Sequence, residues 1–178
     1  MPPIAVLTAV VAVAAFATPP TGAAPLAAAG RGNLSPSRHV RSTQPRTEQM
    51  LDIGAVRSPT FASLRATLEA TDVFVYVQTV THMKPNLDGR LTFLSSTGKY
   101  RYLSIEVRAS LPLNDLLSAI AHELQHAVEV AGSVDVRDSR SMGTFYERIG
   151  VSRGARTSFD TAAARETGAR VRSELLGA

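Results

Sequence analysis

The sequence predicts an α+β domain in which a helix and a short, mostly antiparallel sheet pack on a central helix, followed by two C-terminal helices. Three observations predict this class. Apolar residues recur at helical spacing over residues 112–131. Residues 72–80 are rich in the branched and aromatic side chains of a strand. Residues 90–94 and 100–108 flank a Ser-Ser-Thr-Gly turn, which favours a hairpin.

The first 29 residues are expected to be an export signal and not part of the fold. The apolar run from Ile4 to Ala17 is too short for a comfortable membrane span, and Ala15–Ala17 and Ala27–Ala29 are candidate cleavage sites. The usual positive charges are missing from the start, so a retained anchor is the alternative. We therefore expect a secreted or periplasmic protein without a stable membrane span once the signal is removed.

Residues 30–48 are expected to be a flexible basic linker, because they are rich in Pro, Gly, Ser and Arg and lack apolar periodicity. Much of the formal net charge of +4 comes from four arginines in this stretch, Arg31, Arg38, Arg41 and Arg46. Aromatic residues are not interleaved with them, as they are in single-strand binding segments. No nucleic-acid partner is expected.

The folded domain is expected to span residues 49–178, about the length of one modest domain. It has no cysteine, so the fold relies on core packing or on a metal. Ser58 and Pro59 are typical of a helix start, and the side chains that follow on one face are apolar: Phe61, Leu64 and Leu68. In the second hairpin strand, apolar residues alternate with polar ones, which predicts one buried face: Leu103, Ile105 and Val107.

Two further helices are expected after Gly132. Ser141 is predicted to cap a short helix that carries Met142, Phe145 and Ile149 and ends at Gly150. Ser158 is predicted to open the final helix, whose buried stripe contains mostly small residues: Ala164, Gly168, Val171 and Leu175.

The central helix contains the run His122-Glu123-Leu124-Gln125-His126. At roughly 100° per residue, the two histidines lie about 40° apart, so both rings can reach one metal ion. Zinc suits neutral imidazole ligands. Glu123 projects away from the two rings but can still reach a water beside them. The alternative is an ordinary amphipathic helix whose polar face, with Asp115 and Glu129, meets solvent.

The segment Ala121–His126 resembles the active-site helix of the zincin metallopeptidases. The resemblance implies a zinc ion on His122 and His126, Glu123 as the general base, a third protein ligand further along the chain, and extended peptide bound at a sheet edge. Glu129 and Gly132 stand where the metzincins carry a glycine and a third histidine, and no Asn-Glu-x-x-Ser-Asp segment of thermolysin-like proteins follows. A gluzincin-like arrangement with a downstream carboxylate remains.

Four acidic residues are candidates for the third ligand: Asp160, Glu129, Glu147 and Glu166. Glu129 lies one turn past His126 and fits better as the acceptor of a ring N–H. Glu147 lies beside the apolar face of a short helix, where simple exposure is the alternative reading. Glu166 points away from the small-residue stripe.

We predict Asp160, because Ala164 and Gly168 after it would let the last helix approach another closely. Residues 160–164 also resemble the Glu-x-x-Ala-Asp ligand segment of some gluzincin-like families, with Asp160 in place of Glu and Ala164 in place of Asp. A shorter carboxylate requires closer helices. The alternative is that Asp160 caps the last helix.

Together these residues predict a zinc metallopeptidase that hydrolyses peptide bonds of peptide or protein substrates by a metal-activated water, with Glu123 as the base. Tyr146 is a candidate second donor to the oxyanion. One alternative is a zincin-like envelope module that binds metal or peptide without turnover. The other is a metal-free envelope protein with a fortuitous motif.

Overall fold

The computed structural model describes residues 38–152 and 159–177, and in them it confirms the α+β class. The expected signal at residues 1–29 lies outside the described residues. The elements follow one another in this order: β1 (Val40–Arg41), α1 (Pro45–Arg57), α2 (Pro59–Glu69), β2 (Val73–Val80), β3 (Gly89–Ser96), β4 (Arg101–Arg108), α3 (Leu113–Ala131), α4 (Ser139–Ile149), β5 (Val151–Ser152), β6 (Phe159–Asp160) and α5 (Ala162–Gly177).

The main sheet has the strand order β1-β2-β4-β3 and is mixed, so the prediction of a mostly antiparallel sheet was wrong. The β3–β4 hairpin forms as predicted, but β4 and not β3 lies beside β2, and it runs parallel to β2. Burial explains this order. The inner face of β4 is fully buried and even Ser104 on its other face is nearly so, whereas most of β3 is exposed. A strand buried on both faces belongs in the middle of a sheet.

The fold begins earlier than predicted, because β1 and the start of α1 lie within the stretch expected to be a linker. Val40 is fully buried and pairs with Val75 of β2. Two arginines assigned to the linker have partners in the fold: Arg38 pairs with Asp52, and Arg41 donates to the Tyr76 hydroxyl. In the described residues, no helix combines the length and the apolar character needed to cross a membrane.

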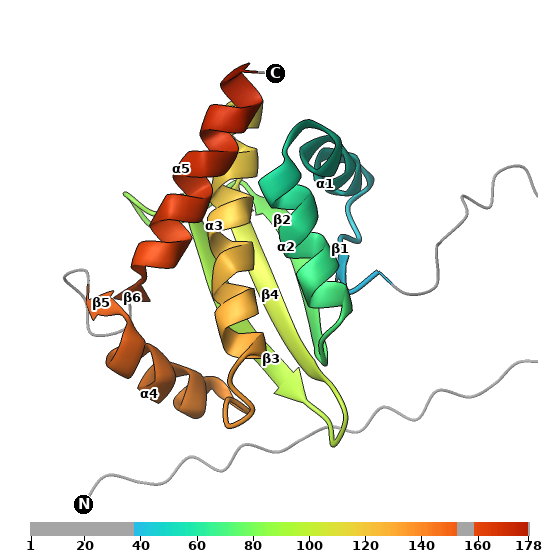
Figure 1. Ribbon diagram of the computed structural model, residues 1–178. Helices are drawn as coiled ribbons and strands as arrows, with labels where there is room; N and C mark the ends of the chain where they lie inside the picture. Colours follow the sequence, from blue (N-terminus) through green and yellow to red (C-terminus); the bar gives the residue numbers. More distant parts are fainter. Residues whose placement is uncertain (1–37, 153–158, 178) are drawn as a thin grey trace, which may run out of the picture. The chain divides into compact units, whose positions relative to one another are not determined.

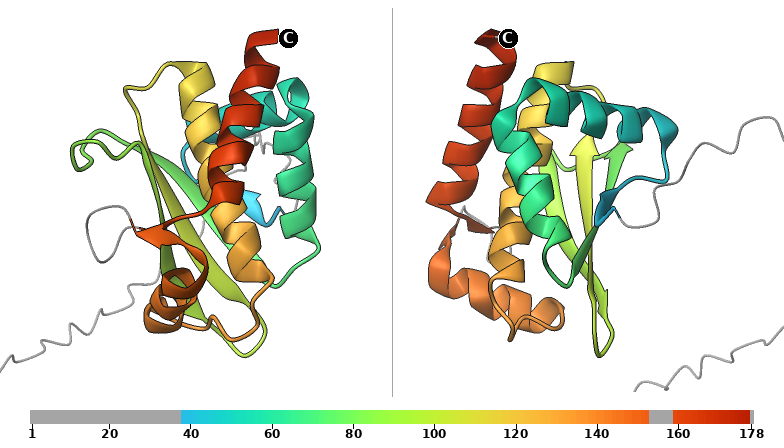
Figure 2. Two further views of the ribbon diagram at one scale, coloured as in Figure 1. Left: turned by 60° about the vertical axis from the view of Figure 1, so that its left-hand side comes forward. Right: turned by 45° about the vertical axis from the view of Figure 1, so that its right-hand side comes forward.

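The helices α2 and α3 pack on one face of the sheet, and α5 lies along the outer side of α3 (Figures 1 and 2). The core lies between the sheet and these two helices. Each element contributes fully buried apolar residues to it, among them Phe61 and Leu68 of α2, Val73 and Val75 of β2, Leu103 and Ile105 of β4, and Leu117, Ile120 and Leu124 of α3. Since α3 has the sheet on one side and α5 on the other, it is the central element, as the sequence predicts.

Burial on two sides changes which residues of α3 are exposed. His126, expected on the polar face, is buried, and so is Glu123, whereas Leu113 at the start of the helix is 37% exposed. The polar face of α3 is therefore not a solvent-exposed face.

Both C-terminal helices start at residues other than those predicted. Asp138 caps α4 by accepting the Ser141 N–H, and Ser141 returns a bond as the third residue of a capping box. α5 begins at Ala162 rather than at Ser158, and the Thr161 hydroxyl accepts the Ala164 N–H. Asp160 therefore does not cap the last helix.

The predicted small-residue stripe of α5 is buried against α3. A Cβ added to Gly168 would lie 3.3 Å from the Ser118 carbonyl oxygen and 3.4 Å from the Cβ of His122. The Ser118 hydroxyl donates to the Gly168 carbonyl across the same contact, at 2.9 Å. Glycine at residue 168 thus sets the distance between the two helices beside the first histidine.

Gly168→Leu is expected to lower the free energy of unfolding by about 1–3 kcal/mol, because overpacking at this contact forces the helices apart. Urea denaturation would measure the loss. The same substitution at Gly143 of α4, where an added Cβ meets nothing within 4 Å, is the control. There the gain in helix propensity should stabilise the protein by about 0.5–1 kcal/mol. Equal effects at the two glycines would contradict the close α3–α5 contact.

Candidate metal centre

The two histidines of α3 lie side by side, one helical turn apart. The ring centroids of His122 and His126 are 4.9 Å apart and the rings are nearly perpendicular, at 78°. The side chain of His122 is 27% exposed, while that of His126 is buried. The pairing that the sequence predicts is therefore present, with one ring open to solvent and one enclosed.

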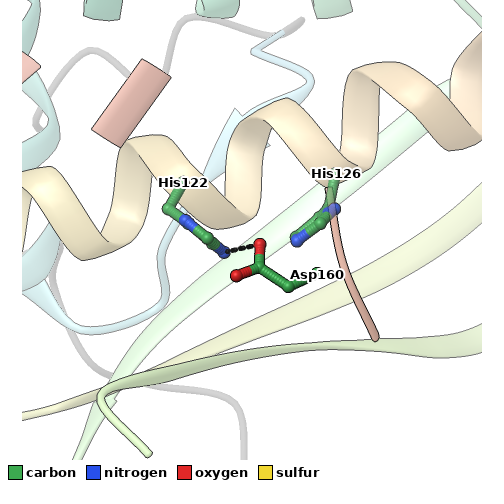
Figure 3. A group of neighbouring side chains, drawn as sticks. All are labelled: His122, His126 and Asp160. Carbon is green, nitrogen blue, oxygen red and sulfur yellow. Dashed lines mark ion pairs between the residues drawn. The ribbon is translucent and has the colours of Figure 1, made fainter. Parts of the chain in front are cut away.

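Asp160 brings a carboxylate to the same place (Figure 3). It ends β6, just ahead of α5, and its Oδ1 lies 3.4 Å from Nε2 of His122. One ligand atom from each of His122, His126 and Asp160 lies within 4.8 Å of the other two. Ligand atoms of a tetrahedral zinc site are about 3.3 Å apart for bonds of about 2.0–2.1 Å, so small side-chain rotations would bring these three onto one ion. Two imidazoles and a carboxylate are a ligand set that suits zinc, and their spacing here is wider than in a bound site.

The other acidic residues do not join the two histidine rings. Glu147 and Glu166 are exposed, and Asp115 pairs with Arg172 at 2.9 Å. Glu129 contacts His126 and not the group of three, as the sequence predicts. Of the four acids weighed, Asp160 is the one that the structure brings to both rings.

Glu129 orients the His126 ring through a contact with the ring nitrogen Nδ1. Its Oε2 lies 2.9 Å from His126 Nδ1, and its Oε1 accepts the Thr161 hydroxyl at 2.6 Å. Burial raises the pKa of Glu129, but the hydrogen bonds from His126 and Thr161 outweigh it and hold that pKa below its usual range. An ionised carboxylate can only accept, so Nδ1 carries a hydrogen, and in the neutral ring Nε2 would hold the lone pair that a metal needs.

Tyr146 of α4 closes the other side of His126. Its hydroxyl donates to the His126 carbonyl oxygen at 2.9 Å, and its ring meets the imidazole edge to face at 5.2 Å. In this arrangement Tyr146 fixes the helix at the histidine. The hydroxyl predicted as a candidate oxyanion donor is therefore engaged by the backbone of α3.

Glu123 lies between α3 and the edge strand β3 and is only 7% exposed. Burial is the main cause that raises the pKa of Glu123 to about 7. A protonated His126 opposes this rise, and the negative charge of Asp160 adds to it. The backbone N–H of Leu91 acts against this rise and favours the ionised form. The expected base is thus held by an edge strand that sequence reasoning did not connect with it.

The pairing of β3 explains why its backbone reaches Glu123. The Arg108 N–H donates to the Asp88 carbonyl at 2.9 Å, and bonded and non-bonded pairs alternate along an antiparallel ladder. Gly89 and Leu91, opposite Val107 and Ile105, are therefore non-bonded positions whose N–H and C=O groups point to the free edge. The backbone of β3 beside Glu123 thus includes groups that point to the open edge of the described sheet.

Gly89 leaves no room for a side chain beside Glu123. An added Cβ would lie 2.9 Å from Glu123 Oε1 and 3.0 Å from its Cγ. The only sequence signal for this contact was Gly89 itself, directly before the strand predicted at residues 90–94. Glycine near a strand is typical of close backbone approach.

Gly89→Ala is expected to displace the Glu123 carboxylate, because the end of a flexible side chain yields more easily than backbone. We expect kcat/KM for the peptide hydrolysis predicted from the sequence to fall about 10- to 100-fold, since small misplacements of a reacting group carry losses of that order. Zinc affinity should stay unchanged. Ser96→Ala, at the exposed far end of β3, is the control. Full activity in Gly89→Ala would show that the observed position of Glu123 does not matter for turnover.

The chain matches no protein-family model, and no significantly similar curated protein or solved structure was found.

Proposed function

We propose that the chain is a secreted or periplasmic zinc-dependent metallopeptidase. The observation that carries the proposal is the convergence of His122, His126 and Asp160, with a buried glutamate directly after the first histidine. The third residue comes from a different element and was chosen from the sequence on separate grounds. A fortuitous motif does not require such a carboxylate.

Zinc, when bound, would activate water and polarise the substrate carbonyl. Glu123 then takes the proton of the water as its oxygen adds to the carbonyl carbon. The same residue passes that proton to the leaving amine as the C–N bond breaks. Glu129 keeps His126 oriented throughout.

The edge strand supports a peptide substrate. β3 has a free edge, and it is the strand that contacts Glu123. An extended peptide paired with this edge would have its carbonyl beside the base and the three ligands. The resemblance to zincin metallopeptidases implies the same placement.

Burial of the site favours a second candidate function, a zincin-like module that binds metal or peptide without turnover. Glu123 and His126 are nearly inaccessible, and His122 is the open side of the group. A substrate carbonyl would have to approach past His122.

Digestion of a broad peptide library by protein purified without an affinity tag tests the proposal. We expect one zinc per chain, cleavage that stops with a chelator, and recovery when zinc is restored. A zinc-containing protein that cleaves no peptide would favour the module. A protein without stoichiometric zinc would overturn the peptidase and the metal-binding form of the module.

A further inference from the structure

The segment that carries Asp160 lies beside the helix that carries the histidines. Among the described residues, β6 pairs with β5 in a ladder of two residues on each strand, and Asp160 Oδ1 lies 3.4 Å from His122 Nε2. The close contact at Gly168 lies seven residues further along α5 than Thr161, about 10 Å at 1.5 Å per residue. Much closer to Asp160, the residue that follows it also contacts α3.

Thr161 makes the nearest tie. Its hydroxyl donates to Glu129 Oε1 at 2.6 Å and accepts the Ala164 N–H at 3.1 Å, and the residue is 5% exposed. The one hydrogen of this hydroxyl thus goes to α3, while its oxygen caps α5. Glu129 then continues the chain of bonds to His126 Nδ1.

These bonds connect two of the three expected ligands without a metal. Asp160 is the chain neighbour of Thr161, and His126 is bound to the carboxylate that Thr161 contacts. We propose that Thr161 is a positioning residue that acts through Glu129 to hold Asp160 in place against the histidine pair, and so sets the affinity of the site for zinc. This inference rests on the proposed zinc site.

The competing explanation is that Thr161 matters only as the cap of α5. Three substitutions separate the two roles. Thr161→Ser keeps both bonds of the hydroxyl, and Thr161→Val loses both in nearly the same volume. Thr161→Asp still caps the helix, because Asp is a preferred capping residue, but its carboxylate cannot donate to Glu129.

Zinc affinity of the full chain, measured by competition with a chromophoric chelator, gives the first readout. We expect Thr161→Ser to bind zinc like the unaltered chain, and both Thr161→Val and Thr161→Asp to lose about 10- to 100-fold, as is typical when a partner behind a ligand is removed. In Thr161→Asp the new carboxylate would lie beside the ionised Glu129, so a loss of affinity is assigned to positioning only when the Co²⁺ spectrum changes as well. Asp138→Ala, which removes the cap of α4 away from the site, should leave zinc affinity unchanged.

The visible absorption spectrum of the Co²⁺-loaded protein gives the second readout, since it reports the geometry of the ligands and not the stability of a helix. We expect an altered spectrum in Thr161→Val and Thr161→Asp and an unaltered one in Thr161→Ser. Thr161→Asp keeps the cap, so the test stands even where Thr161→Val does not fold.

The outcomes are distinct. The positioning role would be overturned if Thr161→Asp kept both its zinc affinity and its Co²⁺ spectrum while only Thr161→Val was impaired. That result would leave the proposed function intact. Failure of the unaltered chain to bind zinc would overturn the proposed function itself.

Discussion

Glu123→Gln is expected to lower peptide hydrolysis by a factor of about 10²–10⁴, the usual contribution of a positioned acid or base. Glutamine keeps the shape of the side chain, but it cannot take a proton from water. The substitution should therefore lower kcat far more than it changes KM. Single-turnover cleavage of a peptide selected from the library would measure the chemical step directly.

Zinc content of the same variant is the necessary companion measurement. Glu123 is not among the three converging ligand residues, so Glu123→Gln should bind one zinc as the unaltered chain does. Glu166→Gln, an exposed glutamate of α5, is the matched control and should keep full activity. Activity retained in Glu123→Gln at full zinc occupancy would eliminate the assigned base.

Arg101→Met is expected to cost about 3–5 kcal/mol of folding free energy, because it removes a buried arginine that donates to several acceptors and leaves them unsatisfied. Arg101 is 1% exposed and donates to both carboxylate oxygens of Asp72, at 2.9 and 2.6 Å. It also donates to carbonyl oxygens at and beyond the end of α3, including those of Val130 and Ser133, both at 2.7 Å. Methionine fills the volume but leaves these oxygens without their donor.

Arg137 provides the control for Arg101. It reaches the same carboxylate, with 3.4 Å between its Nη1 and Asp72 Oδ2, but its side chain is 45% exposed. An exposed pair of this kind contributes about 0–1 kcal/mol, so Arg137→Met should unfold at nearly the same urea concentration as the unaltered chain. Similar losses in the two variants would contradict the structural role of Arg101.

The cost of losing Arg101 should also depend on pH. The hydrogen bond from Arg101 is the main cause that holds the pKa of Asp72 below its ordinary value of 3.8, although burial opposes it. A lowered pKa in the folded state gives stability that is present above the unfolded pKa and is lost as pH falls through the folded one. The difference between the unaltered chain and Arg101→Met should therefore narrow in strong acid.

Periodicity predicted the parts of the molecule that depend on neighbours in sequence. The spacing of His122 and His126 is a property of one helix, and the hairpin depends on one turn. The small residues around Gly168 indicated a close contact for the last helix, which led to Asp160. These features can be predicted without knowing which helices and strands pack against each other.

The rest depends on contacts between distant segments. Arg101 stands at the first position of an alternating strand, and its pattern does not distinguish a surface arginine from one that binds the end of α3. The order of the strands was not predicted either, because the hairpin can place either of its strands beside β2. The burial of Glu123 follows from that order, since β3 covers it only as the edge strand.

The separation in sequence between the histidines and Asp160 has a consequence for how the molecule matures. A nascent chain that has emerged only through α3 carries the two imidazoles but not Asp160, which follows α4 in the sequence. Under the proposed function, such an intermediate would hold zinc less tightly than the folded domain, because the carboxylate would be missing from the site. Metal binding would then follow the formation of β6.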